Sequence, residues 1–443
     1  MVAQQTVCLR QLGAVRAGEV RFGRFLANKN VTMHELRSGV CAPTLARCAG
    51  RHVLAIQDTT EINYQNHARR VSELGTVGNG TDLGLFLHPV LTVDAEDGAC
   101  LGLADLHIWQ RLHGKSPDYK KQPIEEKESY RWLEAPQRAR ECLQSAAKVT
   151  VVADREADIY ELWSRIPDTN TELLIRAGRD RNLVTHTDQK LFEWIAEQPI
   201  RGEYILSLPA IANKRTAHDA LMHVRFEQVT IKKPQSCSDK KAPKQLTLNM
   251  IEVVEDPGTV VGKEKPIHWR LLTTHPVSTL AQALQCIEWY CSRWQIEQFF
   301  RTLKKQGLNV ESSLVEKGER LEKLVVLAAS AAVRTMQLTL AREGNTTRPA
   351  SDTFTKEEQD FLEHLQPELE GKTDKQKNPH EKRTLAWSSW IIARLGGWKG
   401  YSSERKPGPI TMLHGLQRFS SMQQGWLLAR PAARCHRTIY RCG

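Results

Sequence analysis

The chain has 443 residues, of which 40% are hydrophobic and 26% charged, and its 62 lysines and arginines outnumber its 51 acidic residues for a net charge of +11. This composition excludes a disordered or collagen-like chain and predicts about three domains, or one large domain with insertions. There is no run of about 18 apolar residues and no apolar signal-peptide segment, so we expect no membrane span and a cytoplasmic protein. The positive charge suits a polyanion such as DNA. The ten cysteines contain no Cys-x-x-Cys pair, so we expect no zinc site.

In chain order, the first half predicts three strands, a helix and a fourth strand. The strands are expected at 53–57, at 85–93, from Cys100 and at 149–153, with the helix at 123–146. A Gly-rich stretch at 73–84 predicts a loop, and Pro89 indicates an edge strand or a bulge. The short turn between the second and third strands predicts that the first three are consecutive and antiparallel. The first strand ends at Asp58 and the last at Asp154.

The second half changes from strands to helices. Four β-rich runs separated by polar turns predict a β-rich insertion between Asp154 and a long helix. That helix is expected at 279–306, with Ser278 or Thr279 as its N-cap. Later helices are expected at 318–342 and 355–364, and the last hundred or so residues have a mostly helical pattern.

One face of the predicted helix at 279–306 carries a group of polar side chains. Tyr290, Arg293, Glu297, Arg301 and Lys304 fall within roughly an 80° sector of a helix that turns about 100° per residue. A solvated stripe of salt bridges is one interpretation of this pattern. A substrate-binding face is the other.

The two strand-end aspartates favour a binding site. Each aspartate could instead serve as a helix N-cap or form a local Asx-turn. Together with Glu297, however, Asp58 and Asp154 form a set of three carboxylates, the oxygen ligands that hard divalent cations prefer. Two such ions about 4 Å apart can activate a nucleophilic oxygen and stabilise the leaving oxygen of a phosphodiester. The cations beside Glu297 would then face substrate phosphates.

These residues resemble the motifs of the DDE transposases of the bacterial insertion-sequence-four group. The similarity runs from about Arg21 to about Leu428. The motifs that carry it are QDTT at 57–60, DREAD at 154–158, Tyr-x2-Arg-x3-Glu-x6-Lys from Tyr290 to Lys304, EKES at 126–129, TLAQALQCIEWY at 279–290 and AWSSWIIARLGG at 386–397.

The resemblance implies an α/β fold, with a ribonuclease-H-like catalytic core, a β-rich insertion and a helical C-terminal region. It implies that Asp58, Asp154 and Glu297 are catalytic and ligate two Mg²⁺ ions, with Mn²⁺ as a substitute. The implied function is cut-and-paste transposition: nicking at the transposon end, hairpin formation by the freed 3′-hydroxyl, hairpin opening, and strand transfer into target DNA. The implied partners are double-stranded DNA, at transposon ends and target, and a second copy of the chain in a homodimeric DNA complex.

The resemblance also assigns DNA contacts. Tyr290, Arg293 and Lys304 are expected to contact phosphates near the cleaved end, and we expect Arg301 and Arg155 to bind DNA as well. Trp269 occupies the position at which a similar protein stacks a flipped base on a tryptophan. A core tryptophan on a strand is the alternative for that residue.

The expected division of the chain has five parts. These are a remnant of an N-terminal DNA-binding region at 1–50, the first part of the core at 51–165, the β-insertion at 166–277, the second part of the core with the catalytic helix at 278–345, and a helical dimerisation region with a divergent end at 346–443. Fewer residues precede Asp58 than in similar proteins, and the Arg- and Cys-rich tail at 430–443 resembles out-of-frame translation. A second function therefore stays open, that of an N-terminally truncated chain that binds DNA non-specifically or inhibits a full-length transposase by forming mixed dimers.

Overall fold

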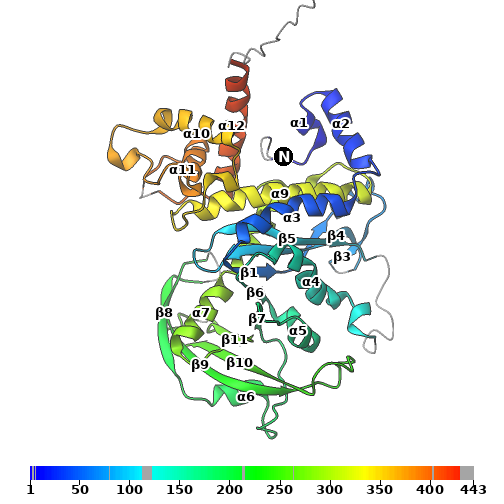
Figure 1. The fold of residues 1–443 in the computed structure, drawn as a ribbon, viewed down its shortest axis with the longest axis vertical. Helices are drawn as coiled ribbons and strands as arrows, with labels where there is room; N and C mark the ends of the chain where they lie inside the picture. The colour runs from blue at the N-terminus through cyan, green and yellow to red at the C-terminus, as the bar shows by residue number, and fades with distance from the viewer. Residues whose placement is uncertain are drawn as a thin grey trace, which may run out of the picture. The chain divides into compact units, whose positions relative to one another are not determined.

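The computed structural model describes residues 1, 4, 6–78, 80–111, 122–211, 215–262, 264–401 and 404–429. The chain forms two compact units (Figure 1). The larger unit comprises Leu26–Phe300 and Val315–Leu327, and the smaller comprises Met1–Phe25, Arg301–Leu314 and Ala328–Gly443. The tail at 430–443 lies outside the described residues, so the interpretation of its sequence stays a prediction.

Within the described residues, the larger unit contains a mixed sheet of eleven strands. The order of hydrogen-bonded neighbours is β2-β4-β1-β6-β7-β11-β10-β9-β8, with β3 and β5 also paired to β4. The strands are β1 (His52–Gln57), β2 (Thr60–Asn63), β3 (Gly75–Val77), β4 (Asp82–Asp94), β5 (Cys100–Trp109), β6 (Lys148–Ala153), β7 (Thr171–Arg176), β8 (Gly202–Leu208), β9 (His218–Lys232), β10 (Gln245–Glu255) and β11 (His268–Thr273).

The helices are distributed over both units. They are α1 (Leu9–Gly13), α2 (Arg16–Ala27), α3 (Met33–Cys48), α4 (Arg131–Leu143), α5 (Tyr160–Arg165), α6 (Leu191–Ala196), α7 (Leu280–Cys291), α8 (Trp294–Lys304), α9 (Gly318–Ala341), α10 (Lys356–Leu369), α11 (Leu385–Leu395) and α12 (Pro409–Ala429). The predicted helical character of the C-terminal region is therefore confirmed as far as the structure describes it.

The centre of the sheet is parallel, whereas its two sides are antiparallel. β1 pairs in parallel with β6, and β6 in parallel with β7. On one side, β1, β4 and β5 are consecutive antiparallel neighbours, which confirms the prediction for the first three strands. On the other side, β11 pairs with β7, so that the β-rich segment continues the same sheet through β10, β9 and β8.

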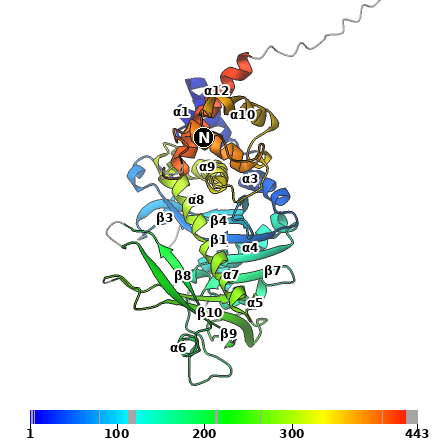
Figure 2. The ribbon, with the colours of Figure 1, turned by 90° about the vertical axis from the view of Figure 1, so that its left-hand side faces the viewer.

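Helices cover both faces of the parallel centre (Figures 1 and 2). Ala55 of β1 belongs to the same hydrophobic cluster as Trp132 of α4, whereas His52 meets the ring of Trp289 on α7 at a centroid distance of 4.7 Å. Odd and even residues of a strand point to opposite faces, so α4 and α7 lie on opposite sides of β1. Burial on both faces explains why β1 and β6 are unbroken apolar runs.

Two local predictions need correction near β4. The loop predicted at 73–84 contains β3 and the start of β4. The indication of a bulge at Pro89 is supported by register shifts just after it, but an edge strand is wrong, because β4 pairs with β5 along one edge and with β1 and β2 along the other. β4 pairs with β2 over 84–87 and with β1 over 90–94, so Pro89 falls where β4 changes partner. A residue without an N–H is tolerated at such an interruption of the ladder.

The helix predicted at 123–146 is shorter, because two 3₁₀ turns precede α4, which begins at Arg131. Pro136 lies inside α4. Proline has no N–H, so it cannot bond the carbonyl four residues earlier, which belongs to Trp132. That carbonyl instead accepts a hydrogen bond from Gln57 Nε2 at 3.3 Å. The freed helix carbonyl thus becomes an anchor for the end of β1.

A hydrophobic core of its own holds the smaller unit together. Aromatic and aliphatic side chains of α10, α11 and α12 form one buried cluster. α12 approaches α11 closely at Gly415, where a Cβ atom would lie 1.9 Å from the carbonyl oxygen of Ile392. Within the described residues, α9 is long and apolar enough to cross a membrane, but 72% of its most apolar window is buried inside the protein, as in a core helix.

Candidate active site

Asp58 and Asp154 lie side by side at the carboxyl-terminal edge of two parallel strands. β1 and β6 pair in register up to two positions before each aspartate. The backbone N–H of Thr59 donates to Asp58 Oδ1 at 2.7 Å, and that of Glu156 donates to Asp154 Oδ1 at 2.8 Å. Asp154 is also the N-cap of a 3₁₀ turn at Arg155–Ala157, as the alternative interpretation of that residue expected. The capping contact engages one oxygen of each carboxylate and sets its direction.

The helix predicted at 279–306 is wrong as a single element, because α7 and α8 are separated at Ser292 and Arg293. Thr279 caps α7 in a capping box, as predicted. At the break, the N–H of Arg293 bonds the carbonyl of Tyr290 at 3.0 Å, three residues back, which is the tighter 3₁₀ pattern. Ser292 Oγ donates to the carbonyl of Glu288 at 3.3 Å, a contact that bends helices. Tyr290 therefore belongs to α7, whereas Glu297, Arg301 and Lys304 belong to α8, so the five residues do not share one continuous helix.

Arg293 joins Glu297 to Asp58, the first of the two strand-end aspartates. Its Nη1 donates to Asp58 Oδ2 at 2.9 Å and its Nη2 to Glu297 Oε1 at 2.8 Å. The side chains of Arg293 and Asp58 are only 18% and 19% exposed, so water screens this ion pair weakly. Asp58 and Glu297 are thus linked by the guanidinium between them, and Asp154 lies beside Asp58 at the neighbouring strand end.

The electrostatics of this cluster favour an additional positive charge. Burial and the nearby charge of Asp154 raise the pKa of Asp58 to about 6, with a smaller contribution from Glu297. The Thr59 N–H and the Arg293 guanidinium lower the same pKa and do not compensate fully. A buried carboxylate that remains difficult to ionise beside two others is a site where a bound cation would be stabilised.

The donor set fits a hard divalent ion, although the side chains are not arranged as a closed metal cage. Among the described residues, no group of three or more His, Cys, Asp or Glu side chains is placed to hold a metal ion. At this cluster, Arg293 lies between Asp58 and Glu297 and uses one oxygen of each. The chemistry of three carboxylates nevertheless matches the ligands of Mg²⁺ or Mn²⁺. Asp58, Asp154 and Glu297 are the residues that could hold such an ion.

Two aromatic side chains lie beside the carboxylates. Tyr290, at the end of α7, is buried, and burial raises its pKa, which the charges of Arg293 and Arg176 lower and that of Asp154 raises. Trp269 on β11 is half-buried and meets the Tyr290 ring edge-on at a centroid distance of 6.4 Å. Trp269 is therefore near the candidate site and retains exposed surface, unlike a tryptophan enclosed in the core.

The remaining predicted DNA contacts fall into two groups. Arg155 is exposed and directly follows Asp154. Arg301 is exposed, and Lys304 forms an ion pair with Glu311 at 3.1 Å. Both of these belong to the smaller unit, whereas Arg155 belongs to the larger one.

The last residue of the DREAD motif, Asp158, has a structural role. It is fully buried and accepts hydrogen bonds from the backbone N–H groups of Gly178 and Arg179, each at 2.9 Å. Trp163 Nε1 and the Arg181 guanidinium also donate to it. These contacts occupy both of its oxygens and tie the segment after β7 to the segment that carries Asp154.

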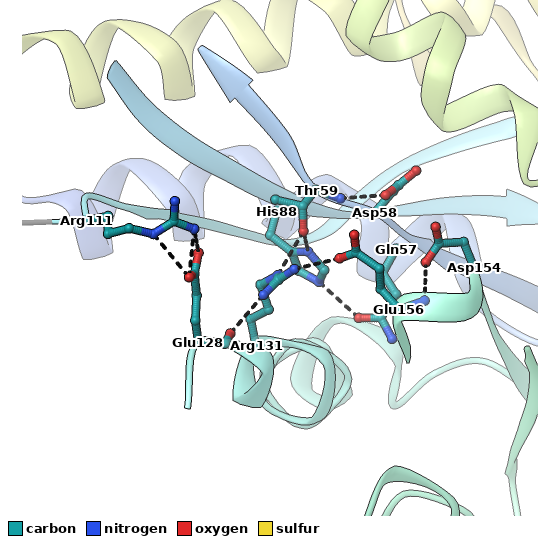
Figure 3. A network of polar contacts seen from close by, with 9 residues as sticks. All are labelled: Gln57, Asp58, Thr59, His88, Arg111, Glu128, Arg131, Asp154 and Glu156. Carbon is teal, nitrogen blue, oxygen red and sulfur yellow. Dashed lines mark hydrogen bonds and ion pairs between the residues drawn. The ribbon is translucent and has the colours of Figure 1, made fainter. Parts of the chain in front are cut away.

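A polar network behind the two aspartates, buried at Gln57 and His88 and exposed at Glu156, was missed by sequence reasoning. It comprises Gln57, Thr59, His88, Arg131 and Glu156 (Figure 3). Three of these residues lie inside or next to the QDTT and EKES motifs, and strand alternation places Gln57 and Thr59 on the side opposite Asp58. This alternation is the one sequence signal that could have identified Gln57 and Thr59 as members of the network. Their partners are far apart in the chain, so no local pattern identifies them.

Part of the chain matches the model of a known protein family. Residues 134–334 match the model of the transposase DDE domain. The matched segment contains Asp154 and Glu297, whereas Asp58 lies before it. The match supports a DDE transposase and suggests metal-dependent cleavage of DNA.

Proposed function

We propose that this protein is a cut-and-paste DNA transposase in which Asp58, Asp154 and Glu297 hold two Mg²⁺ ions. The observation that carries the proposal is that Arg293 bridges Asp58 and Glu297, while the pairing of β1 with β6 places Asp154 beside Asp58. The strand order β5-β4-β1-β6-β7, with β1, β6 and β7 parallel, supports a ribonuclease-H-like core. The match to the transposase DDE domain supports the same chemistry.

The residues around the carboxylates bind different parts of the DNA in this proposal. When bound, the metal ions supply the activated nucleophilic oxygen and stabilise the leaving oxygen. Exposed Arg155 and the guanidinium of Arg293 provide positive charge for phosphates near the scissile bond. Half-buried Trp269, which packs edge-on against the buried Tyr290 ring, stacks a base turned out of the duplex.

The proposed reaction has four stages on one site. Water cleaves one strand at the transposon end and releases a 3′-hydroxyl. That hydroxyl attacks the opposite strand and closes a hairpin, water opens the hairpin, and the restored 3′-hydroxyl attacks target DNA. Each stage exchanges one P–O bond for another, so the same carboxylates serve all four.

The proposed assembly is a homodimer on DNA, within the bacterial cytoplasm at the nucleoid. The helical smaller unit supplies the contact between copies, because the end of α12 exposes apolar side chains. Met422, Leu427 and Leu428 are 45%, 45% and 87% exposed. Apolar side chains that cluster on a surface commonly mark protein interaction sites.

Cleavage assays on variants with neutral side chains test the proposed metal site. Asp58→Asn, Asp154→Asn and Glu297→Gln should each abolish Mg²⁺-dependent strand cleavage, because each removes a charged oxygen ligand without changing side-chain size. Asp168→Asn is the matched control. This aspartate precedes β7, at the opposite edge of the parallel strands, and pairs with Arg140 at 3.2 Å.

The outcome also separates the two functions that the sequence left open. The control should cut DNA like the parent protein. Cleavage near the parent rate by any of the three site variants would overturn the metal assignment. A parent protein that binds duplex DNA but leaves it uncut with both Mg²⁺ and Mn²⁺ would favour the non-catalytic alternative.

A further inference from the structure

Arg131 connects the two loops that carry the catalytic aspartates. Its Nε donates to Thr59 Oγ1 at 2.9 Å and its Nη2 to Glu156 Oε2 at 3.0 Å, while Nη1 donates to the carbonyl of Glu128 at 3.0 Å (Figure 3). The guanidinium therefore uses three separate N–H groups on three partners. One partner is adjacent to Asp58 and another lies two residues after Asp154.

The same two residues hold the catalytic carboxylates directly. Thr59 donates its backbone N–H to Asp58, and its side-chain oxygen accepts from Arg131. Glu156 donates its backbone N–H to Asp154, and its side-chain oxygen accepts from Arg131. Arg131 thus contacts each aspartate indirectly, through Thr59 for Asp58 and through Glu156 for Asp154.

Packing fixes the plane of this guanidinium. The Arg131 side chain is 13% exposed, and its guanidinium carbon lies 5.3 Å from the Trp132 ring centroid and 5.5 Å from that of Trp109. A guanidinium held beside aromatic rings keeps its N–H groups in fixed directions, whereas a lysine ammonium offers no such fork. Lysine at this position would keep the positive charge but would lose the fixed directions in which the guanidinium donates its hydrogen bonds.

A hydrogen-bond chain with a defined direction holds Thr59 from the other side. Gln57 Nε2 donates to Trp132 O, so Gln57 Oε1 accepts from His88 Nε2 at 3.1 Å. Burial, together with the charge of Arg131, holds the pKa of His88 well below its usual value, so the ring is neutral. His88 Nδ1 then accepts from the Thr59 hydroxyl at 2.8 Å, and that oxygen accepts from Arg131. Each donor in the chain has one acceptor, which makes the network rigid.

We infer that Arg131 is a positioning residue that fixes the spacing of Asp58 and Asp154 for metal binding. This inference depends on the proposed metal site. Ligands of a hard divalent ion must be held close to their productive geometry, and the strands alone end before either aspartate. Substitution of residues that orient metal ligands typically lowers metal affinity by about 10–100-fold.

Metal binding by the free protein tests this role without relying on catalysis. Arg131→Gln and Arg131→Lys should both weaken Mn²⁺ binding, measured by electron paramagnetic resonance, by about tenfold or more. Thr59→Val should do the same, because it removes the accepting oxygen, whereas Thr59→Ser should restore affinity. Cleavage by Arg131→Gln should recover as Mg²⁺ is raised.

Arg138→Gln is the matched control on the same helix. Arg138 is 24% exposed and pairs with Asp105 at 2.8 Å, so its loss lowers the unfolding temperature through a comparable ion pair outside the network. It should leave Mn²⁺ affinity at the parent value.

Three results would contradict either the positioning role of Arg131 or the metal site on which that role depends. Parent-like Mn²⁺ affinity in both Arg131→Gln and Thr59→Val would overturn the positioning role, provided that Asp58→Asn and Asp154→Asn lose binding. Undiminished Mn²⁺ binding by those aspartate variants would instead overturn the proposed metal site. If Arg131→Gln fails to fold, the pair Thr59→Val and Thr59→Ser decides, and equal affinities for these two would overturn the inference.

Discussion

At the scale of single residues, the contribution of Asp58 to the stability of the folded protein depends on pH. Burial and the charge of Asp154 raise its pKa to about 6, above the value of about 3.9 for an exposed aspartate. A carboxyl group whose pKa is raised by folding binds more protons in the folded state. Its stabilising contribution is therefore complete below about pH 4 and is lost as the pH rises through about 6.

Asp58→Asn should consequently unfold at a higher temperature than the parent protein at about pH 7.5 without divalent ions. The shift in pKa corresponds to at most roughly 3 kcal/mol, and weakened contacts with Arg293 reduce that gain. Thermal unfolding between about pH 4 and pH 7.5 should show the difference shrinking as the pH falls. For Asp168, hydrogen bonds and Arg140 lower the pKa against burial, so Asp168→Asn should be destabilised at neutral pH. If the difference in unfolding temperature between Asp58→Asn and the parent protein stayed constant from about pH 4 to pH 7.5, the raised pKa of Asp58 would be contradicted.

At the scale of elements, the contact between α11 and α12 depends on a residue without a side chain. Gly415→Ala would place a Cβ atom 1.9 Å from the carbonyl of Ile392, so the two helices would have to separate. We expect a loss of about 1–3 kcal/mol in the free energy of unfolding, measured by denaturant titration.

Gly425→Ala on the same helix is the control for helix propensity. A Cβ atom there meets nothing within 4 Å. Alanine is a better helix former than glycine by up to about 1 kcal/mol, so Gly425→Ala should be neutral or stabilising. A similar loss in both variants would show that the crossing of α11 and α12 is not the cause.

The elements also show what a sequence can predict. The apolar runs of β1 and β6 were identifiable because both faces of these strands are buried, and Asp58 and Asp154 stood out because each closes such a run. The break between α7 and α8 was not identifiable, because the spacing of Tyr290, Arg293 and Glu297 was interpreted with one uniform helical period.

Arg131 illustrates a different limit. In sequence it follows EKES and Tyr130 as one more charge in a charged stretch. Its role depends on two residues, Thr59 and Glu156, that only the pairing of β1 with β6 brings together. Periodicity and motif spacing describe local structure, so contacts between distant segments of the chain remain outside their reach.

At the scale of the whole molecule, the charge of +11 predicts salt-sensitive binding to duplex DNA. The logarithm of affinity should fall linearly with the logarithm of salt concentration, by about 0.9 for each phosphate neutralised. Arg155→Ala should reduce that slope by about one unit, because Arg155 is exposed beside the proposed site. Arg138→Ala, whose arginine is already paired with Asp105, should leave it unchanged. Fluorescence anisotropy between about 50 and 200 mM salt measures both slopes, and affinity independent of salt would exclude phosphate contacts as the source of binding.

The pairing of strands that lie far apart in the chain also affects how fast the protein folds. β1 and β6 join residues about a hundred positions apart, such as His52 and Lys148, and β7 and β11 join Arg176 to Leu271. The entropy lost in closing such long loops precedes any gain from the contacts, so folding is slow, and unpaired strand edges stay open to other chains meanwhile. We therefore expect Asp58 and Asp154 to come together late on the folding pathway. The yield of active protein from expression should then rise when synthesis is slowed by cooling or when chaperones shield those edges.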